Sequence, residues 1–209
     1  MKITIICENT VGRRIGLGEH GFSAFIETGQ GNYLFDTGSG HSVVKNSLEL
    51  NKGLRSIKKI FLSHGHFDHT GGLPEVLKLK GKVDVHTHPD VFLDRIHLIR
   101  ENKKEIRKFV GLPYKKKYLE SLGANFVFNR DFIEVGKGLF LTGEVPRKTP
   151  FEKPDPVLFA EIDGGAGAPR SRATRSVPPR IRLAPATVQG VGNSPNTASC
   201  HPIANATCR

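Results

Sequence analysis

Residues 64–69 place four potential metal ligands within six positions: His64, His66, Asp68 and His69. Neutral imidazoles and a carboxylate suit zinc and other borderline divalent ions. His64 and His66, two apart in an extended loop, can point at one ion, while Asp68 and His69 turn the other way and can reach a second. A solvated His-rich loop is the alternative, but it does not account for an aspartate and flanking glycines in the same stretch. The spacing therefore predicts a loop for two divalent ions, zinc in the first place.

Regular elements must hold this loop in place, and the apolar patterns around it indicate them. The short apolar run at 59–62 predicts a buried strand that leads into the loop, and Pro74 predicts the first turn of the helix that follows it. Further strands are predicted at 2–7, 21–28, 32–35, 83–87, 125–128, 132–135, 139–141 and 157–162, and helices at 42–51, 74–80, 90–100 and 114–122. Strands and helices that alternate in this way predict an α/β layered domain with a mixed sheet.

The composition changes abruptly near Asp163, and this change predicts two parts. The whole chain has 209 residues and a net charge of +11, yet residues 164–209 hold six Arg, no Lys and no acidic residue. Large apolar side chains nearly vanish there, so this segment cannot offset its ordering entropy. We therefore expect a domain at 1–163 and a low-complexity, disordered tail at 164–209. The switch from Lys to Arg, Ala and Pro is typical of a frameshifted or fused segment.

Charge and cysteine usage exclude several classes of protein. The basic tail lacks interleaved aromatic residues and any recognisable motif, which argues against a nucleic-acid partner. No apolar run is long enough for a membrane-spanning helix. The three cysteines Cys7, Cys200 and Cys208 are odd in number and far apart, so they favour a reducing, cytoplasmic setting over a disulfide scaffold.

The run His-Gly-His-Phe-Asp-His at 64–69, directly after a strand, resembles the hallmark motif of the metallo-β-lactamase superfamily. The run Leu-Phe-Asp-Thr-Gly at 34–38 is similar to that superfamily's earlier motif. By itself the Asp-Thr-Gly run reads as a strand-ending turn. The resemblance implies a four-layer αβ/βα sandwich, of which residues 1–163 would form the N-terminal half. It also implies that Asp36 hydrogen-bonds beneath the metal loop.

Shorter stretches point to one branch of the superfamily. Residues 8–10, 18–23, 64–73 and 88–90 resemble the dihydropterin ribofuranosyl-aminobenzene-phosphate synthase-like proteins. This resemblance implies a cytoplasmic protein and a pocket lined by His20, for which a plain surface role is the alternative. His88, two positions after His86, could line the same pocket or complete a metal site.

The resemblance implies metal-assisted hydrolysis, or a related addition–elimination, on a small and phosphorylated molecule. His64 and His66 would hold one ion, and Asp68 and His69 the other, with manganese or iron as alternatives to zinc. Asp68 would be the catalytic residue, since it would also orient the attacking water.

The sequence departs from the family pattern in its second half. The family's Gly-Cys-Ser-His stretch and its terminal Gly-x-His segment are both absent, and His201 is the only histidine beyond residue 100. We therefore expect the C-terminal half of the family domain to be missing or replaced. The alternative to an enzyme is a catalytically inactive, truncated metal-binding domain. Its apolar faces would be exposed, which favours a homo-oligomer.

Overall fold

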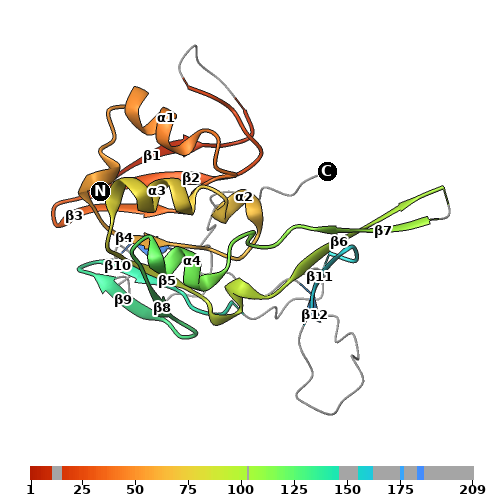
Figure 1. Cartoon of the computed structure of the whole chain (residues 1–209). Helices are drawn as coiled ribbons and strands as arrows, with labels where there is room; N and C mark the ends of the chain where they lie inside the picture. The colour runs from red at the N-terminus through yellow and green to blue at the C-terminus, as the bar shows by residue number, and fades with distance from the viewer. Residues whose placement is uncertain (11–15, 103, 146–154, 162–174, 177–182, 186–209) are drawn as a thin grey trace, which may run out of the picture.

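A mixed six-stranded sheet forms the centre of the computed structural model, which describes residues 1–10, 16–102, 104–145, 155–161, 175–176 and 183–185 (Figure 1). Its strands, in spatial order, are β1 (Lys2–Cys7), β2 (Ser23–Thr28), β3 (Gly31–Phe35), β4 (Ile57–Phe61), β5 (Val83–Thr87) and β8 (Ala124–Phe128). Strand β2 is antiparallel to both of its neighbours, β1 and β3, and the strands β3, β4, β5 and β8 are parallel. The predicted α/β class with a mixed sheet is confirmed.

Helices cover one face of this sheet, because the crossovers between parallel strands need them. They are α1 (Val43–Glu49), α3 (Leu73–Lys80) and α4 (Lys116–Ser121). Val43, Leu77 and Leu119 from these helices pack with Leu34 and Ile60 of the sheet in one buried cluster. Two short 3-10 helices lie in the connections: η1 (Leu54–Ser56) precedes β4, and η2 (Pro89–Phe92) follows β5. No helix in the described ranges is long and apolar enough to cross a membrane.

A small sheet covers the opposite face. It contains β9 (Ile133–Gly136), β10 (Leu139–Leu141) and β13 (Leu183–Pro185). Leu139 and Leu141 pack against Tyr33 and Phe61 of the central sheet. Strand β13 comes from the segment predicted as an irregular tail, and it pairs with β10. The predicted boundary at residue 163 and most of that tail lie outside the described residues.

A third sheet projects from this body in the order β12-β11-β6-β7. Its strands are β6 (Arg95–Glu101), β7 (Lys104–Phe109), β11 (Leu158–Ala160) and β12 (Arg175–Ser176), and the β6–β7 hairpin extends beyond the other two (Figure 1). The predicted helix at 90–100 is therefore wrong. Six cross-strand pairs with β7 stabilise β6 as a strand. A local apolar pattern does not reveal such a partner.

The candidate site residues lie just beyond the carboxyl ends of neighbouring strands, at one edge of the sheet. Asp36 follows β3, His64 follows β4 and His88 follows β5. These strands are parallel neighbours, so their carboxyl ends lie side by side. This edge is where open α/β sheets bind their ligands.

Candidate metal centre

The loop after β4 turns at His66 into the short helix α2 (Phe67–Thr70). The amide of Thr70 donates to the His66 carbonyl at 3.1 Å, and the amide of Phe67 donates to the Val110 carbonyl at 3.0 Å. The next turn packs tightly on the loop after β3, since a Cβ on Gly72 would lie 2.1 Å from the Thr37 carbonyl oxygen. Glycine is therefore required where these two loops meet.

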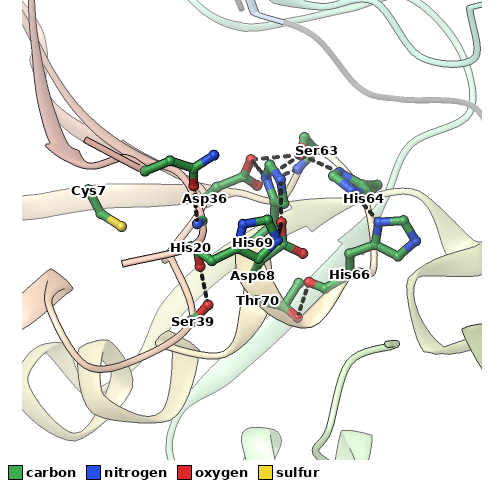
Figure 2. Close-up of polar contacts among 12 residues, drawn as sticks. Cys7, His20, Asp36, Ser39, Ser63, His64, His66, Asp68, His69 and Thr70 are labelled. Atoms are coloured by element: carbon green, nitrogen blue, oxygen red, sulfur yellow. Dashed lines mark hydrogen bonds and ion pairs between the residues drawn. The ribbon is translucent and has the colours of Figure 1, made fainter. Parts of the chain in front are cut away.

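Two of the four predicted ligands face each other across this loop. His64 Nε2 lies 3.1 Å from His66 Nδ1, and the Ser63 hydroxyl lies 2.8 Å from the other nitrogen of His64 (Figure 2). Two ligand atoms on one tetrahedral zinc ion, each about 2.0–2.1 Å from the metal, lie about 3.4 Å apart. The His64–His66 pair is close to that separation.

The other two predicted ligands form a second pair. His69 Nε2 lies 3.4 Å from Asp68 Oδ2, again close to the spacing of two ligand atoms on one ion. His20 approaches the same carboxylate, with its Nε2 at 3.5 Å from Asp68 Oδ2, and its side chain is half exposed. The structure thus brings His20 to the rim of the loop, beside Asp68.

Asp36 lies buried beneath both pairs and hydrogen-bonds to each side (Figure 2). Its Oδ1 accepts the Ser63 amide at 2.7 Å, and its Oδ2 accepts the Ser63 hydroxyl at 2.7 Å. The same Oδ2 lies 2.7 Å from His69 Nδ1, which orients Nε2 toward Asp68. A carboxylate that holds the far nitrogen of an imidazole in this way is typical of metal-binding histidines.

The charges around His69 shift two pKa values, that of His69 itself and that of Asp68. Burial alone would lower the pKa of His69, but the carboxylates of Asp36 and Asp68 raise it to about 9. Burial likewise opposes the ionisation of Asp68, yet the hydrogen bond and charge of His69, with the charge of His66, lower its pKa. In the metal-free chain these carboxylates therefore favour a positive charge at His69, and a metal ion bound there would displace its proton.

Imidazole nitrogens and a carboxylate are ligand types that suit divalent ions, and here they lie in two pairs. In the part of the chain that the structure describes, no group of three or more His, Cys, Asp or Glu side chains is arranged to hold one metal ion. Three protein ligands are usual for a catalytic zinc. The described residues thus offer ligand atoms in pairs, one fewer than the three usual for a catalytic zinc.

His88 belongs to a separate polar cluster at the end of β5. Its Nδ1 accepts the Asp90 amide at 3.1 Å, and its Nε2 lies 2.8 Å from Glu144 Oε1. The Arg130 guanidinium donates to the same Glu144 oxygen at 2.7 Å. The hydrogen bond from His88, with Arg130, lowers the pKa of Glu144. Both ring nitrogens of His88 thus have hydrogen-bond partners. The neighbouring His86 is bonded elsewhere, with its Nδ1 at 3.0 Å from Asn129 Oδ1.

From the sequence alone, Glu144 could approach the site, although a turn residue is the better interpretation, and no role follows for Arg130. The sequence does carry one signal for them, because Arg130 follows the strand predicted at 125–128 and Glu144 follows the strand predicted at 139–141. The local sequence pattern does not show which strands are neighbours. That order in the sheets is what brings the residues after these two strands close to His88.

Comparison with known proteins relates this chain to a family and to several relatives. The family model described as "Metallo-beta-lactamase superfamily" matches residues 17–169. A protein of Methanocaldococcus jannaschii named 7,8-dihydropterin-6-methyl-4-(beta-D-ribofuranosyl)-aminobenzene-5'-phosphate synthase is 31% identical over 155 residues, which cover 70% of this chain and 52% of that protein. The uncharacterized protein MJ0448 of the same organism is 30% identical over 153 residues, 72% of this chain and 56% of that protein. The chain thus spans about half the length of these curated relatives.

A solved structure supports the fold. The crystal structure of Tm1679, described as a metal-dependent hydrolase of the β-lactamase superfamily, matches with a TM-score of 0.63 at 24% identity. The match covers 87% of this chain and 59% of that chain. At this level of identity the likeness concerns the fold alone.

Proposed function

Since the chain belongs to the metallo-β-lactamase superfamily, we propose that it is a metal-dependent hydrolase that acts on a small, phosphorylated molecule. The observation that carries this proposal is the position of Asp36. One buried carboxylate hydrogen-bonds to Ser63 and His69, and so supports both ligand pairs of the loop. A loop that only faces solvent does not require a buried carboxylate that fixes its histidines.

We propose that His64 and His66 hold one divalent ion and that Asp68 and His69 hold another. Zinc is the first candidate, because imidazole nitrogen and carboxylate oxygen suit it, and manganese or iron are the alternatives. An ion in such a site supplies Lewis acidity to the reaction.

The protein's own residues orient the reacting groups. Asp36 orients His69 through Nδ1, and it fixes Ser63, which in turn contacts His64. We propose that Asp68, whose pKa is lowered by the hydrogen bond and charge of His69, orients the attacking water. His20, half exposed beside Asp68, is placed to contact the substrate. Asp68 is accordingly the proposed catalytic residue.

The proposed substrate class rests on the named relative. That protein is a synthase of an aminobenzene 5'-phosphate compound, and it is 31% identical over about half its length. A phosphorylated small molecule is therefore the first class to test. We also propose a cytoplasmic location, which the three widely spaced cysteines support.

Metal content and phosphoester hydrolysis test the proposal together. Elemental analysis of the monodisperse chain should give a metal-to-protein ratio near two, and hydrolysis of a chromogenic phosphoester should depend on that metal. Asp68→Ala should abolish turnover, whereas Asp131→Ala, at an exposed carboxylate outside residues 64–69, should leave it unchanged.

Two outcomes would contradict the proposal. Unchanged turnover in Asp68→Ala would rule out the catalytic role of Asp68. Bound metal without turnover on any phosphoester would favour the alternative, a catalytically inactive metal-binding domain.

A further inference from the structure

Arg95, the first residue of β6, lies buried directly beside the metal loop. Its side chain belongs to a residue only 2% exposed, and a Cβ on Gly65 would lie 3.0 Å from its Nε. Its Nη2 donates to the Asp90 carbonyl of η2 at 2.8 Å, and its own carbonyl accepts the Val110 amide at 2.8 Å. The guanidinium therefore lies between the loop and η2, while the backbone of Arg95 is bonded to Val110, the residue after β7.

The positive charge of Arg95 is poorly compensated. Among the residues for which the structure gives positions, no carboxylate forms an ion pair with it, and its Nε is buried without a hydrogen-bond partner. The Asp90 carboxylate faces elsewhere, toward His88 at 3.7 Å and Arg130 at 3.6 Å. Burial lowers the pKa of Arg95 to about 10, which the charge of Asp90 opposes only in part. Arg95 is still a cation at neutral pH.

A buried, unpaired cation costs stability, and an apolar side chain of similar length would fill the same space without that cost. Residues that break a packing rule in this way are expected at functional sites. A cation buried against Gly65, the residue between His64 and His66, weakens the binding of a further cation but favours the binding of an anion. The charge of Arg95 therefore favours the binding of an anionic group, and it does not help to bind a metal ion.

We propose that Arg95 is a specificity-determining residue whose buried charge favours substrates with a phosphate group at the His64–His66 side of the site. This inference rests on the proposed function, because it assumes that the loop holds divalent metal. Arg95 acts through its field and does not touch the substrate. At an effective dielectric constant of about 20, one unit charge within about 10 Å changes the affinity for an anion by roughly tenfold.

The sign of the effect on zinc separates this role from a purely structural one. If Arg95 only supported the loop, its replacement by Met would weaken zinc binding. If it acts by charge, Arg95→Met keeps or strengthens zinc binding and weakens the binding of phosphate.

The experiment is isothermal titration of zinc into the metal-free chain, followed by titration of inorganic phosphate or acetate into the zinc-loaded chain. Arg95→Met should bind phosphate roughly tenfold more weakly or worse, with a smaller loss for acetate. Arg95→Lys, which keeps the charge, should stay within about threefold of the wild type. Arg100→Met, at an exposed arginine on the same strand, is the matched control and should change neither affinity.

Several results would overturn the inference. Unchanged phosphate affinity in Arg95→Met would do so, as would loss of zinc in both Arg95→Met and Arg95→Lys. An equal loss for acetate would overturn the assignment to phosphate. If Arg95→Met does not fold, equal phosphate affinities in Arg95→Lys and Arg95→Gln would count against the inference. A wild-type chain that binds no zinc would contradict the proposed function itself and, with it, the role of Arg95.

Discussion

Asp36 connects the two halves of the candidate site at the scale of single residues. It adopts a left-handed backbone conformation, with φ of 56°, directly after β3. That conformation is uncommon for a residue with a Cβ, and aspartate tolerates it better than most. From this position the carboxylate reaches Ser63 and His69 in the next loop along the sheet edge.

Replacement of Asp36 by asparagine tests this connection. Asp36→Asn keeps the size of the side chain but leaves one accepting oxygen, which cannot serve both the Ser63 amide and His69 Nδ1, so the imidazole of His69 loses its orientation. Metal affinity should fall by roughly 10- to 100-fold, measured by competition with a chromogenic chelator. Asp131→Asn, at an exposed position, serves as the control. An Asp36→Asn chain with wild-type affinity would show that the carboxylate does not support the site.

Cys7 provides a pH-dependent test at the same scale. Burial, assisted by the hydrogen bond to Glu19, raises the pKa of its thiol to about 12 from 9.0. In a chain with Cys200→Ser and Cys208→Ser, this sole thiol should carry about a thousand-fold less thiolate than an exposed one. Reaction with Ellman's reagent at pH 8 should therefore be slow in the native chain and fast in urea.

The same thiol links stability to pH. Its pKa in the folded state lies above that in the unfolded state, so its contribution to stability is fully present below pH 9 and is lost as the pH rises toward 12. The free energy of unfolding should decline over that window, and less steeply in Cys7→Ala. Equal slopes in the two chains would exclude the thiol as the cause.

At the scale of elements, tight backbone contacts hold the metal loop. The loop after β4 packs against η2, where a Cβ on Gly65 would lie 2.2 Å from the Val91 carbonyl oxygen. The helix α2 packs against the loop after β3, where the Thr37 amide donates to the His69 carbonyl at 2.8 Å. The ligands are therefore placed by two neighbouring strand ends and by the segment that follows β5.

Substitution at Gly65 measures how closely this packing constrains the ligands. Gly65→Ala should force η2 away from the loop, at a cost of about 1–3 kcal/mol in the free energy of unfolding, and should weaken zinc binding. Gly29→Ala is the matched control, since a Cβ there meets no heavy atom within 4 Å. Equal stability and zinc affinity in the two variants, by urea unfolding and calorimetry, would mean that the loop adapts freely.

At the scale of the whole molecule, the central sheet is covered on both faces by segments that are far apart in the sequence. Helices pack on one face, and β9 and β10 pack on the other. Two short strands from residues 164–209 also pair with the body, β13 with β10 and β12 with β11. The chain spans 52% and 56% of its two curated relatives, and the described residues provide two ligands for each proposed ion. The activity of a complete relative therefore remains a proposal for this chain.

The elements near the site were largely predictable from sequence. The strands at 2–7, 83–87 and 139–141 have the predicted bounds, because their apolar patterns are local and strong. The predicted helix at 90–100 was wrong, because β6 is stabilised by pairs with β7 and β11 that local periodicity does not contain. A prediction from local patterns fails where the partner strand decides the structure.

By itself, the sequence determined the candidate ligands and their superfamily. Four ligand types within six positions are a local property, and the strand and helix that flank them follow from local apolar spacing. The resemblance also implied that Asp36 hydrogen-bonds beneath the loop, but only the tertiary structure decided that its partners are Ser63 and His69. The tertiary structure alone also decided the bond between His88 and Glu144 and the buried charge of Arg95 beside Gly65. These contacts join residues 27 to 56 positions apart along the chain. They depend on which strands are neighbours and on how deeply each side chain is buried, and both are properties of the whole folded chain.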